Sequence, residues 1–267
     1  PISIYSMNWD GAQFSAPISL DRSFNGVSFT GGAAQDLELA LDQTGHPYIA
    51  WTDQMNGSPQ IYLRGNTHDL TGTVYPIQTG FNVQNFLNAQ DLGPGDVLVI
   101  NGTVAGFSIA VGDSGVVILG APGATITGDL AVNADDVTVQ GLTITGAIAA
   151  TNSTRFSLRE SVVSGNVTLT GGNSSQLVHN ILKGASAVTI GGAAVNPAIF
   201  FNTVQASGTG VTLTGVGSSG SIVFQNKITA PLGISLGPLS TGTIESNDVI
   251  GSSTGLDVTG EIGRAHV

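Results

Sequence analysis

From about residue 96 onward, apolar residues recur in a repeating unit. The segments GLTITG, ESVVSG, HNILKG, FNTVQAS, QNKITA and SNDVIGS align on one position, spaced by 19, 19, 22, 24 and 21 residues. A second set of segments repeats as NVTLTG, AVTIGG, GVTLTG, GISLGP and GLDVTG. Two apolar strands in each unit of roughly 22 residues predict the coils of a parallel β-helix, in which each coil pairs with its neighbours about 4.8 Å away.

The aligned position predicts a stacked polar ladder inside an aliphatic core. It is occupied by Leu142, Ser161, Asn180, Asn202, Asn226 and Asn247. Residues at a bend between two strands stack over their counterparts in the next coil, so the four Asn side chains are expected to hydrogen-bond along the axis. The residues three before and two after are expected to fill one core: Val139, Leu158, Leu177, Ile199, Val223, Ile244, Ile144, Val163, Leu182, Val204, Ile228 and Val249.

A short amphipathic helix is predicted ahead of the coils. In FNVQNFLNAQDLGPGD, Val83, Phe86 and Leu87 have helical spacing, Asn82 is a suitable N-cap, and residues 93–95 (Gly-Pro-Gly) stop the helix. Parallel β-helix proteins commonly begin with such a helix, which covers the N-terminal end of the coil.

The first 69 residues follow a different pattern. Polar and apolar residues alternate at 37–41, 48–51 and 60–63, and turn-forming residues separate these segments. This pattern predicts an antiparallel meander of three strands. The stretch LALDQTGHPYIAW resembles one blade of bacterial β-propeller repeats of the sialidase type, although the Ser-x-Asp box of that family is incomplete. Either further blades precede these strands, or the strands cover the end of the next domain.

Residues 81–260 resemble right-handed parallel β-helix proteins of the pectate-lyase-like superfamily. We therefore predict an all-β fold: a right-handed parallel β-helix with a short N-terminal capping helix and an N-terminal antiparallel β meander. The expected division is 1–69 as a partial propeller-like meander, 70–95 as linker and capping helix, 96–261 as the β-helix and 262–267 as a tail. The tail, IGRAHV, looks like a translated sequencing adapter, so we expect an artefact at the end of a fragment.

The amino-acid composition limits the classes of molecule that the protein is expected to bind. The formal net charge is -11, with only seven Lys and Arg residues, so neither nucleic acid nor an anionic membrane surface is an expected partner. Cysteine is absent, which excludes disulfides and thiol nucleophiles. No apolar stretch is long enough to span a membrane. We expect an extracellular or cell-surface protein without a cofactor or metal, and a polysaccharide or cell-surface glycan as its partner.

Catalytic residues are hard to find in this pattern. The adjacent acids Asp135 and Asp136 precede a strand, where Asp commonly forms turns, and no further hydrolase motif accompanies them. Lyase chemistry needs cations around the substrate, yet the coils contain only Arg155, Arg159, Lys183 and Lys227. Two other matches, at 112–115 for a serine nucleophile and at 215–220 for a dinucleotide loop, lack the surrounding elements that those sites require. No catalytic residue and no metal ligand is assigned.

An acid, an imidazole and several aromatic residues are expected along one surface of successive coils. Glu160 and His179 occupy equivalent positions in successive coils and should lie near each other, where they could transfer protons or only aid solubility. The next coils place Phe200-Phe201 and Phe224 there, an aromatic stripe suited to sugar rings or to packing under a loop. We expect a non-catalytic, adhesin-like or carbohydrate-contacting scaffold. The alternatives are a polysaccharide lyase, hydrolase or epimerase, and a purely structural spacer.

Overall fold

The computed structural model describes residues 35–41, 47–53, 60–65, 72–90, 92–214, 220–238 and 242–258. The chain divides into two compact units, Pro1–Val74 and Tyr75–Val267. The segment before residue 35, most of the dinucleotide-like match at 215–220 and the adapter-like tail at 262–267 lie outside the described residues.

The first unit contains the predicted meander. Strands β1 (Gln35–Leu41), β2 (Pro47–Asp53) and β3 (Gln60–Gly65) form one antiparallel sheet in the order β1-β2-β3. Glu38 is paired with Ala50, and Ala50 with Leu63. The three strands expected from alternating residues are therefore confirmed, with each running one or more residues beyond its predicted core.

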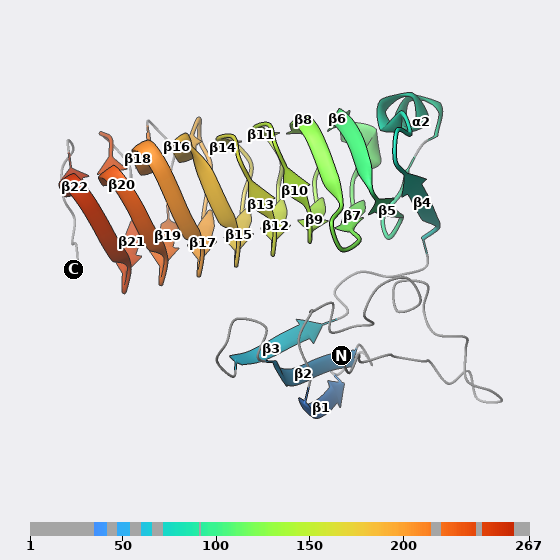
Figure 1. The fold of residues 1–267 in the computed structure, drawn as a ribbon, viewed down its shortest axis with the longest axis horizontal. Coiled ribbons are helices and arrows are strands. Elements are labelled where there is room, and N and C mark those ends of the chain that lie inside the picture. Colours follow the sequence, from blue (N-terminus) through green and yellow to red (C-terminus); the bar gives the residue numbers. More distant parts are fainter. Residues whose placement is uncertain are drawn as a thin grey trace. The chain divides into compact units, whose positions relative to one another are not determined.

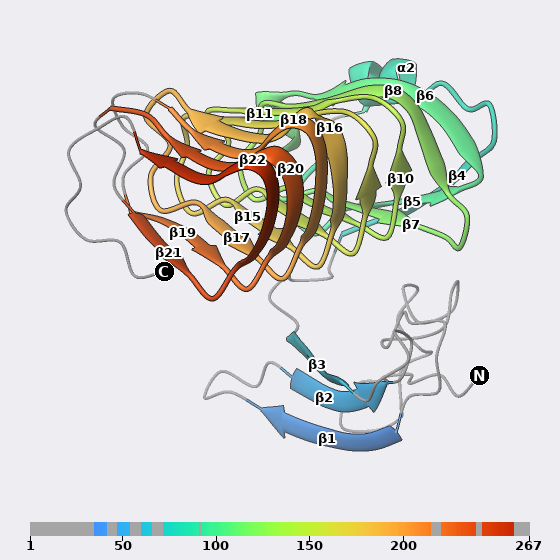
Figure 2. The same ribbon diagram turned by 60° about the vertical axis from the view of Figure 1, so that its left-hand side comes forward.

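The second unit is a parallel β-helix, as the repeat predicted, and the chain is all-β (Figures 1 and 2). Its nine-stranded sheet contains β4 (Val74–Gln78), β5 (Val97–Asn101), β7 (Val117–Gly120), β9 (Thr138–Gln140), β12 (Ser157–Arg159), β15 (Gln176–Val178), β17 (Ala198–Phe200), β19 (Ser221–Phe224) and β21 (Gly242–Glu245). Its ten-stranded sheet contains β6 (Thr103–Ile109), β8 (Thr125–Val132), β10 (Thr143–Ile144), β11 (Ile148–Thr151), β13 (Val162–Val163), β14 (Val167–Thr170), β16 (Ile181–Gly191), β18 (Thr203–Leu213), β20 (Lys227–Leu236) and β22 (Asp248–Val258).

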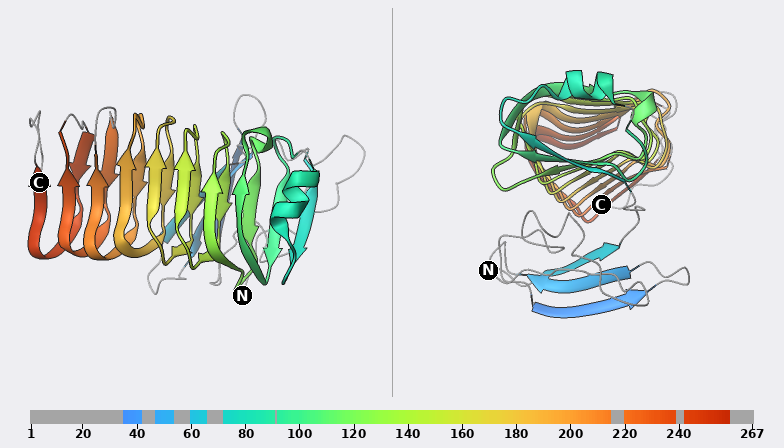
Figure 3. Two further views of the ribbon diagram at one scale, coloured as in Figure 1. Left: turned by 90° about the horizontal axis from the view of Figure 1, so that it is seen from above. Right: turned by 90° about the vertical axis from the view of Figure 1, so that its right-hand side faces the viewer.

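Successive coils stack in the predicted register. Leu158 pairs with Leu177, which pairs with Ile199 in the next coil. Figure 3 shows the stack from above in its left panel and end-on, down the axis, in its right panel. Ten of the twelve predicted core residues are 0% exposed, and Ile244 and Val249 in the last described coil are partly exposed. The aliphatic positions therefore form one continuous core, because every second residue of a strand points to the same side.

The predicted Asn ladder is present where the chain turns sharply from the nine-stranded to the ten-stranded sheet. The Asn180 amide donates to Asn202 Oδ1 (2.9 Å), Asn202 donates to Asn226 Oδ1 (3.0 Å), and Asn226 donates to Asn247 Oδ1 (2.9 Å). Each amide also bonds to backbone: Asn202 Nδ2 donates to the carbonyls of Leu177 and Phe200. Asn180, Asn202 and Asn226 are buried but fully engaged, which offsets the cost of removing amides from water.

The predicted helix α2 (Val83–Ala89) covers the edge of the ten-stranded sheet beside β6. Asn82 is its N-cap, and the side chain accepts a bond from Asn85 N. The helix ends at Ala89, before the expected Gly-Pro-Gly stop. Gln84 Oε1 accepts from Ser108 N (2.8 Å), so the helix satisfies a backbone donor on the edge strand. Within the described residues, no helix is long and apolar enough to cross a membrane.

Candidate functional site

The residue before each ladder position forms a column along one corner of the β-helix. We call Glu160, His179, Phe201, Gln225 and Ser246 the corner column. All five have a positive φ, between 49° and 56°, and Gly141 occupies the equivalent place in the preceding coil with φ 71°. Positive φ costs an L-residue about 1–2 kcal/mol, and glycine avoids this cost. Side chains therefore stand at this corner where glycine would be the least strained residue.

The coil stack compensates for the strained corner. The first four corner N–H groups each donate to a carbonyl in the next coil, as in Glu160 N to Val178 O (3.2 Å) and His179 N to Phe200 O (3.2 Å). The Asn ladder holds the following residue in place. The backbone is consequently fixed on both sides of the corner, and the side chains project from a rigid support.

Aromatic side chains cluster at this corner in successive coils. The His179 ring stacks on Phe201, with centroids 5.0 Å apart and an interplanar angle of 10°. Phe224 packs edge-on against Phe200 (6.3 Å) and Phe201 (6.0 Å). Phe201 is 44% exposed, and Ile222, two residues before Phe224 on β19, is 39% exposed. The cluster is thus a supported apolar surface in contact with water.

Polar side chains occupy the preceding coils of the same face. Glu160 Oε2 accepts from Gln140 Nε2 at 2.7 Å. The Arg159 guanidinium donates through Nε to Ser157 Oγ (2.7 Å) and through Nη2 to Gln176 Oε1 (3.2 Å). These bonds orient the exposed Arg159 side chain with neutral acceptors.

Electrostatics at the corner favour an uncharged imidazole. Burial lowers the pKa of His179 below its ordinary value of 6.5, the Glu160 carboxylate acts to raise it, and Arg159 acts to lower it. Neighbouring protein atoms likewise lower the pKa of Arg159 by displacing water. Glu160 and His179 are therefore electrostatically coupled neighbours, as their equivalent sequence positions predicted.

The acids Asp135 and Asp136 lie in a different turn of the coil. Asp136 has φ 59° and forms an ion pair with Arg155 of the next coil, whose Nη2 donates to Asp136 Oδ2 at 2.6 Å. This hydrogen bond, with the Asp136 charge, raises the pKa of Arg155. Asp135 Oδ1 accepts from Thr154 N at 2.7 Å. Both carboxylates connect adjacent coils, in keeping with the turn-forming role expected for them.

The serine-protease-like match is also part of a turn. Asp113 is buried and accepts from Ala110 N at 3.1 Å, while Ser114 Oγ donates to Val111 O at 3.0 Å. Lys183 and Lys227 are exposed on β16 and β20 of the ten-stranded sheet, on the strands that follow the corner. Among the residues that the structure describes, no group of three or more His, Cys, Asp or Glu is placed to hold a metal.

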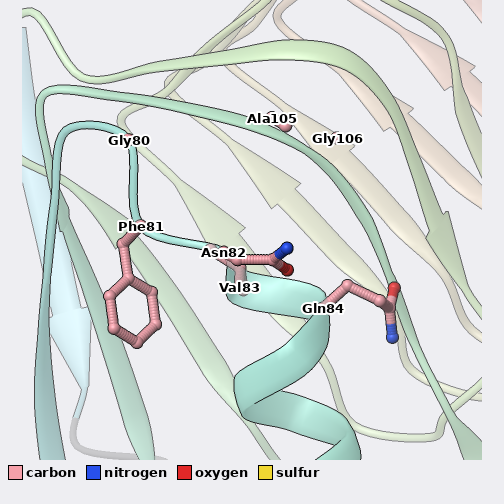
Figure 4. A pocket seen from close by; sticks show the side chains of 7 residues that line it. All are labelled: Gly80, Phe81, Asn82, Val83, Gln84, Ala105 and Gly106. Atoms are coloured by element: carbon pink, nitrogen blue, oxygen red, sulfur yellow. The ribbon is translucent and has the colours of Figure 1, made fainter.

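A shallow pocket of about 330 Å³ lies between the start of α2 and β6 (Figure 4). Its lining includes Phe81, Asn82, Gln84 and Gly106. Asn82 and Gln84 already bond to backbone donors, so the polar groups at its rim serve the helix cap and the sheet edge.

Several members of the polar cluster were missed by the sequence analysis. Gln140 is the register partner of Arg159, Ser157 lies two residues before Arg159 on β12, and Gln176 is the register partner of Ser157. These residues stand one or three positions before a position of the corner column, so counting back from that column would have located them. Their chemistry is common on exposed strands, so the residue types alone carried no signal.

Stacked parallel strands, a buried Asn ladder and a capped first edge define this chain as a parallel β-helix protein. Comparison with known proteins adds no narrower assignment: no family model, no curated protein and no solved structure matches the chain.

Proposed function

We propose that this protein is a secreted or cell-surface scaffold of the pectate-lyase-like class that contacts carbohydrate without catalysis. The observation that supports the proposal is the exposed aromatic cluster at and beside the corner column, where Phe200, Phe201 and Phe224 meet across adjacent coils. Aromatic rings beside oriented polar groups are the surface that sugars need, since pyranoses combine apolar C–H faces with hydroxyls. On the same reading, the N-terminal meander derives from a propeller-type repeat.

The non-catalytic part of the proposal rests on the engagement of the two candidate groups. Glu160 is bonded to Gln140, and His179 stacks on Phe201. An enzyme acting on uronate polymers must also stabilise developing charge with converging cations. Among the described residues near the corner, Arg159 precedes the corner column and Lys227 follows it by two residues on β20, so these two cations stand on different sheets of a chain with net charge -11.

Binding and turnover assays test both parts. Purified protein is expected to bind neutral glycans on an array, and Phe201→Ala is expected to reduce that binding. Pectate, polygalacturonate and alginate should give no unsaturated products and no new reducing ends, with or without calcium. Turnover that disappears in Glu160→Gln or His179→Ala would instead make this corner an active site. Failure to bind any glycan would remove the carbohydrate proposal.

A further inference from the structure

The face beside the corner column changes character along the helix axis. Strand register aligns Arg159, Val178, Phe200 and Phe224 in one row across β12, β15, β17 and β19. Adjacent strands lie about 4.8 Å apart, so this row extends over roughly 14 Å. Its first end is polar and its last end aromatic, and the chemistry varies along the axis because each coil contributes one residue.

A ligand that crosses the row, parallel to the strands, meets much less contact surface than one that follows the row. Strands β12, β15 and β17 are three residues long. On one side of them the chain turns into the buried ladder residues Ser161, Asn180 and Asn202. A linear ligand therefore gains more contact by following the row than by crossing it.

Charge along the row disfavours an acidic polymer. Glu160 follows Arg159 at the corner of the same coil, and Glu245 follows Phe224 in register in the next coil. The single cation of the row therefore has an acid beside it, and a second acid lies beyond the aromatic end. Together with the net charge of -11, this arrangement repels a polyanion and leaves a neutral polyol as the matching ligand.

Resting on the carbohydrate proposal above, we propose that this row binds an extended, neutral β-linked oligosaccharide laid along the helix axis. The spacing of the coils is close to the length by which one extended β-1,4-linked pyranose advances its chain, so each strand of the row contacts one sugar. Arg159 and Gln176 bind hydroxyls at the first end, and the rings of Phe200 and Phe224 contact C–H faces at the last. Four strands give four subsites.

Calorimetric titration of the full chain with neutral β-1,4-linked gluco-oligosaccharides of two to six units tests this arrangement. Affinity is expected to rise with each unit up to four and then stay level. Arg159→Ala and Phe224→Ala, at opposite ends of the row, should each weaken tetrasaccharide binding by about fivefold or more while changing disaccharide binding less. Thr229→Ala, exposed on β20 of the other sheet, is the matched control and should bind like the parent.

Phe224→Leu, which removes the ring but keeps an apolar side chain, replaces Phe224→Ala if the latter fails to fold, as judged by circular dichroism and thermal midpoint. Glycan binding that does not depend on chain length, or that both end variants leave unchanged, would overturn the axial arrangement and leave the broader carbohydrate proposal standing. An oligouronate that binds more tightly than the neutral oligomer of equal length would overturn the choice of a neutral ligand. Absence of binding to every glycan would instead be the failure of the broader proposal.

Discussion

At the scale of single residues, the corner column combines backbone strain with exposed side chains. Phe201 has φ 56° and is 44% exposed, so little apolar burial accounts for its presence in the left-handed region. Substitution with glycine removes the steric penalty, whereas alanine retains it. We expect Phe201→Gly to be more stable than Phe201→Ala by about 1 kcal/mol in urea unfolding. Equal stabilities would show that the corner is not strained.

The same corner predicts a dependence of stability on pH. Because the pKa of His179 is lowered in the folded chain, the unfolded chain binds a proton first as the pH falls below 6.5. The contribution of neutral His179 to stability is thus present above pH 6.5 and is lost below it. His179→Phe keeps a ring against Phe201 but does not titrate. Between pH 7.5 and pH 5, the thermal midpoint of the parent should fall further than that of the variant.

At the scale of the elements, the Asn ladder ties each strand pair to its neighbours. Asn202 is 1% exposed, and its side chain bonds to Asn180, Asn226 and two backbone carbonyls. Asn202→Ala leaves several of these groups without partners in the interior, at an expected cost of about 3 kcal/mol. Asn247→Ala, at the partly exposed end of the ladder, should cost roughly 1 kcal/mol because water replaces the lost bonds. Equal losses in chemical denaturation would contradict this role of burial.

At the scale of the whole molecule, stacked coils contact mainly their neighbours, so energetic coupling should be short-ranged. Leu177 and Ile199 are register partners, whereas Ile118 and Ile199 are separated by three intervening strands of the sheet. Destabilisation by Ile118→Val and Ile199→Val should therefore add within about 0.5 kcal/mol. Leu177→Ala with Ile199→Val should deviate from additivity by more than that. If double-mutant cycles gave a larger deviation from additivity for Ile118 and Ile199 than for Leu177 and Ile199, energetic coupling would extend along the whole solenoid.

The sequence by itself determined the repeating coil, the core positions, the ladder and the capping helix. These features depend on local periodicity, and a residue such as Leu177 or Asn202 must recur wherever a coil closes on the one below. Only the tertiary structure decided how the corner works. The stacking of His179 on Phe201, the orientation of Arg159 by Gln176 and the positive φ along the column arise from strand register and from contacts about 20 residues apart. A one-residue change of register would move each of these side chains to the opposite face, so the site follows from pairing between coils rather than from any motif within one.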